Sequence, residues 1–124
     1  MPAKRILIVE DDVPLRRLFR TTLALAGYEV EEAGDGIEAL HIVENNPPDL
    51  VILDLVLRVL DGVSVQQDLT SRATTAHIPI VVVTGSTIDT EQLPVKCVLH
   101  KLVMPDELLR TVKECLAAAP VAGT

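Results

Sequence analysis

Asp49-Leu50-Val51-Ile52-Leu53-Asp54 is an unbroken apolar run that begins and ends on a carboxylate. Four consecutive apolar residues that include valine and isoleucine are typical of a strand buried on both faces, as in the centre of a parallel sheet. Asp54 then lies at the carboxyl end of this predicted strand. Because ligands of open α/β sheets bind at that edge, the stretch predicts both a fold class and the location of a site.

Apolar runs and helical patterns alternate along the rest of the chain. We expect strands at 5–9, 28–33, 50–53, 80–83 and 95–100. We expect helices at 13–26, 37–43, 63–69, 86–93 and 105–118. Five βα units joined by right-handed crossovers form a doubly wound parallel sheet with helices on both faces. The second strand alternates apolar and polar residues like an edge strand, which favours the flavodoxin-like order 2-1-3-4-5. Pro94 limits the fourth helix, which we expect to be shortened or irregular.

Composition restricts the class of protein. The 124 residues suit one domain, and aromatic residues are only 2% of the chain, so the core must be aliphatic. A net charge of -7 disfavours binding to nucleic acid, and no apolar run is long enough to cross a membrane. Cys97 and Cys115 lack metal-site spacing, so we expect two separate reduced core cysteines. Reduced cysteines and the absence of a signal-peptide pattern favour a cytoplasmic location.

Polar groups follow four of the five predicted strands. Glu10 and Asp11 end the first, Asp54 the third, Thr84 the fourth and Lys101 the fifth. In a parallel sheet these groups converge at one edge. Clustered carboxylates need a cation, and hard oxygen ligands favour Mg²⁺, while a lysine and a hydroxyl can hold phosphoryl oxygens. Such a set suits phosphoryl transfer, which depends on positioning and charge neutralisation.

Each of these residues also has an ordinary structural interpretation. Glu10 and Asp11 could belong to a helix N-cap region, Thr84 to a turn, and Lys101 to the solvated surface. Their joint occurrence at the correct strand ends favours a functional interpretation.

These motifs resemble the receiver domain of response regulators in two-component signalling. The resemblance rests on residues 6–12, on 49–55 followed by Asp61-Gly62, on 78–84 and on Lys101, and it covers nearly the whole chain. It implies a single receiver domain over residues 1–119, followed by a frayed tail at 120–124. No output domain follows in this chain, so we expect a stand-alone receiver.

The resemblance implies specific roles for the strand-end residues. It makes Asp54 the phosphoacceptor, with Thr84 as the switch hydroxyl and Lys101 as the ion-pair partner of the phosphoryl group. The implied Mg²⁺ ligands are Glu10, Asp11, Asp54 and the backbone carbonyl of Val56. Asp12 would lie outside this set.

The implied partners are proteins. A sensor histidine kinase or a histidine phosphotransfer protein would donate the phosphoryl group, and a downstream protein would receive the signal. The chain would not be a turnover enzyme, although it takes part in its own phosphorylation and hydrolysis. We expect a monomer or a weak homodimer.

The sequence departs from the family pattern between the fourth and fifth strands. Leu102 replaces the usual proline after the lysine, so we expect no cis peptide there. Val98 stands where an aromatic switch residue is usual, and the 85–94 segment is short. These departures support an alternative function, a switch-impaired interaction module that acts without phosphorylation. An aspartyl-phosphate phosphatase is disfavoured, because that chemistry needs an aspartate where Val56 stands.

Overall fold

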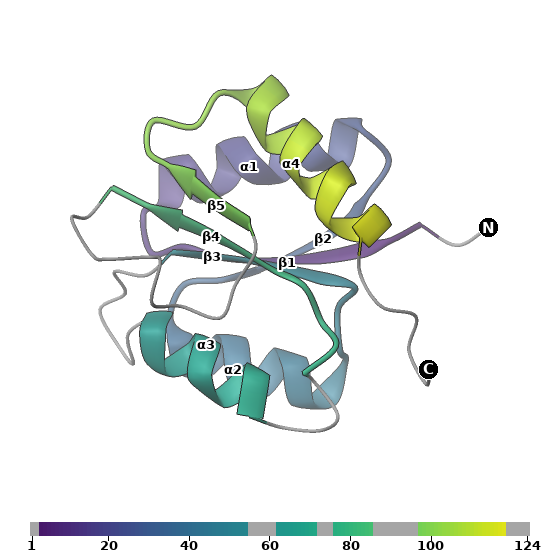
Figure 1. Ribbon diagram of the computed structural model, residues 1–124. Coiled ribbons are helices and arrows are strands. Elements are labelled where there is room, and N and C mark those ends of the chain that lie inside the picture. Colours follow the sequence, from purple (N-terminus) through teal and green to yellow (C-terminus); the bar gives the residue numbers. More distant parts are fainter. Residues whose placement is uncertain (1–2, 55–61, 72–75, 86–96, 119–124) are drawn as a thin grey trace.

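A computed structural model of the chain describes residues 3–54, 62–71, 76–85 and 97–118 (Figure 1). The strands are β1 (Arg5–Val9), β2 (Glu29–Ala33), β3 (Leu50–Asp54), β4 (Ile80–Thr84) and β5 (Cys97–His100). The helices are α1 (Val13–Leu25), α2 (Gly36–Asn45), α3 (Gly62–Ser71) and α4 (Pro105–Ala118). All neighbouring strands are parallel, in the order β2-β1-β3-β4-β5, which confirms the predicted flavodoxin-like fold.

Some predictions fall outside the described residues. These are the short fourth helix at 86–93, the start of the fifth strand at 95–96 and the tail at 120–124.

The sheet separates two layers of helices. In Figure 1, α1 and α4 cover one face and α2 and α3 cover the other. Successive side chains of β3 alternate between the two apolar clusters, because strand residues point to opposite faces in turn. Leu50 and Ile52 pack with α1 and α4, whereas Val51 and Leu53 pack with the α2 and α3 side. Every position of β3 is buried, and each large apolar side chain there contributes about 1.5–3 kcal/mol through burial.

The amino end of the sheet fixes the register of β1 against β3. The backbone N–H of Arg5 donates to Oδ2 of Asp49 over 2.7 Å, and the N–H of Asp49 donates to the carbonyl of Arg5 over 2.8 Å. Val9 consequently pairs with Leu53 at the opposite end. The residues that follow both strands therefore emerge side by side.

The boundaries of α1 follow from its sequence. Pro14 lies in the first turn, where its missing N–H costs no hydrogen bond, and Gly27 adopts φ 98° just beyond the end. In the part of the chain that the structure describes, no helix has both the length and the apolarity needed to cross a membrane.

The cysteine prediction is wrong. The structure joins Cys97 of β5 and Cys115 of α4 in a disulfide, with 6.9 Å between their Cα atoms. Spacing along the chain could not reveal this pairing, because it arises from the way α4 packs over β5. A disulfide here does not indicate a reducing compartment, and the cytoplasmic location remains a prediction.

Candidate functional site

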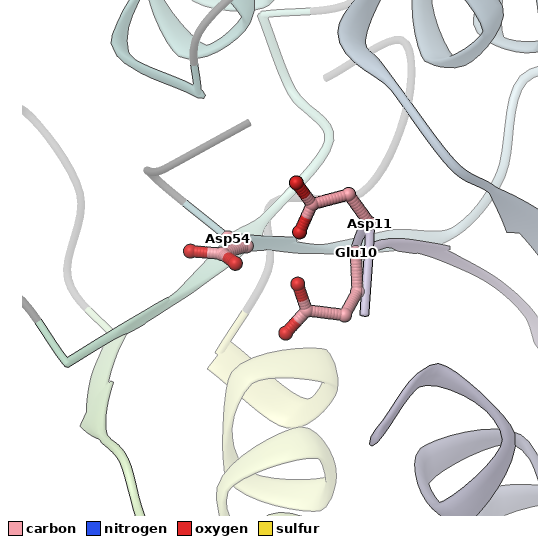
Figure 2. Close-up of side chains that lie close together, drawn as sticks. All are labelled: Glu10, Asp11 and Asp54. Atoms are coloured by element: carbon pink, nitrogen blue, oxygen red, sulfur yellow. The ribbon is translucent and has the colours of Figure 1, made fainter. Parts of the chain in front are cut away.

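Three carboxylates converge beyond the ends of β1 and β3. Glu10 and Asp11 follow β1, and Asp54 is the last residue of β3. Each residue offers one carboxylate oxygen within 4.8 Å of the others, and Figure 2 shows the three side chains close together. Glu10 and Asp54 are only 1% and 3% exposed. The site is therefore a compact acidic cluster largely removed from solvent.

Lys101 reaches this cluster from beyond β5. Its Nζ lies 3.1 Å from Oδ2 of Asp54 and 3.3 Å from Oε1 of Glu10. The backbone N–H of Lys101 donates to the carbonyl of Thr84 over 3.0 Å, which extends the pairing of β4 and β5 by one residue. A Cβ on Gly85 would lie 3.4 Å from Cδ of Lys101, so Gly85 closely borders the lysine stem. These contacts direct the ammonium group toward the carboxylates.

The peptide bond between Lys101 and Leu102 is cis. Our expectation of a trans bond at this position is wrong, since leucine takes the cis geometry that we linked to proline.

Burial and charge change the protonation of the site. Burial, and then the neighbouring Asp54 carboxylate, raise the pKa of Glu10 from its ordinary 4.5 to about 8, although Lys101 acts in the opposite direction. Burial disfavours the charged form of Lys101, but its contacts with Asp54 and Glu10 outweigh that effect and raise its pKa. Without a metal, the cluster therefore holds a proton on Glu10 at neutral pH.

The donor set fits a divalent cation. Oε1 of Glu10 is buried and, within the described part of the chain, accepts no hydrogen bond, although Nζ of Lys101 lies 3.3 Å away. A buried carboxylate oxygen left in this state has spare capacity for a ligand. Three converging carboxylates supply the hard oxygen atoms that Mg²⁺ prefers. The structure thus brings together Glu10, Asp11 and Asp54, as the sequence predicted.

The structure places the other residues that the sequence analysis singled out in different surroundings. Thr84 is fully buried at the end of β4, next to β3 in the sheet, and Asp12 is exposed at the start of α1. Val98 is partly buried and packs against the α2 and α3 side of the core. Val56 lies outside the described residues, so its carbonyl remains a predicted ligand.

One residue outside the predicted set contacts the backbone of the site. Arg16 of α1 donates from Nη1 to the backbone carbonyl of Glu10 over 2.9 Å. The sequence places Arg16 on the second turn of a helix that follows an acidic strand end, and this position could have indicated a contact with the site. The position alone is not specific, because arginine is also common on solvated helix faces. The contact depends on tertiary packing that the pattern does not encode.

The sequence of this chain is similar to those of response regulators. The family model described as the response regulator receiver domain matches residues 6–113. The response regulator MprA of Mycobacterium sp. (strain KMS) is 46% identical over 81 residues, which cover 65% of this chain and 34% of that protein. The chain thus spans about a third of the length of this curated relative.

Solved structures extend the similarity to the whole fold. A CheY-like receiver domain protein from Methanospirillum hungatei JF-1 matches with a TM-score of 0.87 and 28% identity, over 94% of this chain and 95% of that one. The receiver domain of the sensor histidine kinase PA1611 from Pseudomonas aeruginosa PAO1 also matches with a TM-score of 0.87. It is 27% identical, covers 94% of this chain and 100% of its own, and was solved with a magnesium ion coordinated in the active site cleft.

Proposed function

This chain belongs to the response regulator receiver domain family, and from that premise we propose that Asp54 accepts a phosphoryl group from a phosphohistidine on a partner protein. The donor is a sensor histidine kinase or a histidine phosphotransfer protein. One observation carries the proposal above all: Glu10, Asp11 and Asp54 share a buried cluster, with the Lys101 ammonium 3.1 Å from Asp54.

The proposed transfer exchanges one bond to phosphorus for another. A carboxylate oxygen of Asp54 attacks the phosphorus atom, an oxygen–phosphorus bond forms, and the bond from phosphorus to the imidazole nitrogen breaks. The electron pair of the broken bond stays on the imidazole, which then takes up a proton. An acyl phosphate on Asp54 is the product.

Charge neutralisation is the main requirement of this step. Glu10, Asp11, Asp54 and the Val56 carbonyl would hold Mg²⁺, which, when bound, neutralises charge on the phosphoryl oxygens. Lys101 pairs with a further phosphoryl oxygen, and the hydroxyl of Thr84 donates a hydrogen bond to another. The magnesium ion in the similar PA1611 receiver supports this choice of metal.

We infer that the chain acts as a signalling component and not as a turnover enzyme. After phosphorylation, a downstream protein would recognise the altered surface. The proposal concerns only the receiver part, because the matched relative MprA is about three times as long as the matched region.

Phosphorylation by a small donor tests the proposal directly. Purified protein is incubated with acetyl phosphate and Mg²⁺, and intact mass spectrometry measures the phosphorylated fraction. We expect phosphate on the parent and on Asp12→Ala, because Asp12 is exposed and lies outside the proposed ligands. We expect none on Asp54→Ala, nor on the parent with excess chelator. Phosphate retained by Asp54→Ala would contradict the assignment.

A second candidate is a switch-impaired interaction module. It is favoured by Val98, which packs against the core and has no ring to change position. The two candidates differ in their response to beryllofluoride with Mg²⁺, a mimic of the acyl phosphate. A receiver that switches would show changes in backbone NMR shifts at residues of β5 and α4 remote from Asp54, whereas an impaired module would show changes only at residues that border Asp54, such as the end of β4.

A further inference from the structure

Arg16 links the end of β1 to β2 through its guanidinium group. Its Nη1 donates over 2.9 Å to the backbone carbonyl of Glu10, and its Nε donates over 3.1 Å to Oε1 of Glu32. The arginine side chain is 19% exposed, so both contacts are partly shielded from water. Both go to groups other than the carboxylates of the acidic cluster. Arg16 therefore acts on the site through the backbone.

The carbonyl of Glu10 needs a donor from outside the sheet. The last paired residues of β1 and β2 are Val9 and Ala33, and the N–H of Glu10 still donates to the carbonyl of Ala33 over 3.1 Å. Glu10 lies one residue past the end of β1 and past the last pair of β1 and β2, so strand pairing does not extend to its carbonyl. Arg16 supplies a donor to this carbonyl.

This carbonyl belongs to the peptide group that joins Glu10 to Asp11. A peptide group is planar, so fixing its oxygen fixes the orientation of the whole unit. The two residues on either side of it provide two of the three carboxylates in the cluster. A contact that holds this peptide group therefore restrains the directions in which both side chains leave the backbone.

The surroundings of Arg16 keep the guanidinium in this position. A Cβ on Gly34 would lie only 3.2 Å from Nη1, so the absence of a side chain there leaves room for the group. Glu32 also pairs with Arg20 through its other oxygen, at 2.9 Å. Arg20 lies one turn later on α1 and is 58% exposed, and among the residues that the structure describes its side chain pairs with Glu32 and not with the Glu10 carbonyl. It is a matched control for Arg16.

We propose that Arg16 is a positioning residue that sets the affinity of the acidic cluster for Mg²⁺ by holding the Glu10–Asp11 peptide group. The inference rests on the metal site of the proposed function. Removal of Arg16 would change the affinity for Mg²⁺ in opposite directions, depending on whether its positioning role or its positive charge matters more. Loss of positioning weakens Mg²⁺ binding, whereas loss of a nearby positive charge alone strengthens it.

Titration with Mg²⁺ alone, followed by NMR of the full chain, tests this inference without any phosphoryl donor. We expect Arg16→Met to raise the dissociation constant for Mg²⁺ about tenfold, as is usual when a partner outside the metal's own ligands is lost. Arg20→Met should stay within about twofold of the parent, because it removes a charge from the same ion-pair group but leaves Glu10 held. Arg16→Lys keeps the charge without the forked geometry and should restore only part of the affinity.

A second variant keeps every charge and the arginine itself. Gly34→Ala places a methyl group against Nη1, so the guanidinium must shift by a few tenths of an ångström. We expect the dissociation constant to rise about threefold, since the donor is displaced but not lost. Thermal unfolding without metal checks that each variant is folded, and if Arg16→Met is not, Gly34→Ala decides.

Each outcome has a distinct meaning. A parent that binds no Mg²⁺ would overturn the metal site of the proposed function, and this inference with it. If the parent binds Mg²⁺ but folded Arg16→Met binds as tightly as Arg20→Met, or more tightly, only the role of Arg16 fails. Unchanged affinity in Gly34→Ala would likewise overturn the positioning role whenever Arg16→Met does not fold.

Discussion

The apolar part of β3 and the acidic cluster at its end are both removed from solvent, but burial has opposite effects in the two regions. Burial of the Leu53 side chain stabilises the folded protein, because apolar surface leaves water. Burial of the adjacent Asp54 carboxylate has the opposite effect on the free energy of folding, because a charged group loses its hydration. The apolar region contributes to folding at any pH. The acidic cluster costs folding energy unless Lys101, a proton or a cation compensates it. The stability contributed by the apolar region therefore offsets the cost of folding an acidic site that is itself unfavourable.

Truncation in the apolar region gives the largest expected effect. Leu53→Ala removes a fully buried side chain that packs on the α2 and α3 side of the sheet. We expect a loss of about 2–5 kcal/mol in the free energy of unfolding, from lost transfer energy and the cavity left behind. Urea unfolding measures it, and the loss should be the same at about pH 6 and about pH 8. A pH-dependent loss would show that the stability of the apolar region is not independent of the acidic cluster.

The second prediction concerns Glu10 and pH. Its folded pKa of about 8 exceeds its ordinary 4.5, so between these values the folded protein binds a proton that the unfolded chain does not. Stability must then fall as pH rises, by about 2 kcal/mol from about pH 6 to about pH 7.5. Glu10→Gln, which stays neutral, should lose this dependence.

Metal-free urea unfolding of both proteins across that range provides the measurement. Saturating Mg²⁺ should weaken the pH dependence of the parent, because a bound cation favours the ionised carboxylate. If Glu10→Gln kept the full dependence of the parent, the proton would have to reside on another group.

Lys101 gives the smallest effect. Lys101→Met leaves Glu10 and Asp54 without their ammonium partner, but the lysine side chain is 30% exposed and solvent screens part of the interaction. We expect a loss of about 1 kcal/mol in metal-free unfolding free energy near pH 8. Lys113→Met, on an exposed position of α4, should change it by less than about 0.5 kcal/mol. Equal losses in the two variants would show that the Lys101 contacts contribute nothing specific.

Much of the fold was predictable because it follows from short-range patterns. The run from Leu50 to Leu53 fixed a central buried strand, and parallel pairing then required the polar strand ends to meet. The convergence of Glu10, Asp11 and Asp54 followed from that topology alone.

The details that sequence missed depend on packing between distant segments. Arg16 donates to a backbone carbonyl, and a pattern of side chains cannot indicate such a contact. Lys101 contacts two carboxylates, which depends on the conformation of its side chain. The pairing of Cys97 with Cys115 arises where α4 crosses β5. The isomer of the peptide before Leu102 was also predicted wrongly, since we inferred it from the missing proline.

The strict alternation of β3 has an evolutionary consequence. Because Leu50 and Ile52 face one helix layer and Val51 and Leu53 the other, deletion or insertion of one residue would reverse every side chain that follows. Such a change would carry the carboxylate of Asp54 to the wrong face without altering Asp54 itself. We therefore expect lineages of this protein to exchange valine, leucine and isoleucine within β3 freely, but to conserve its length as strictly as the aspartate.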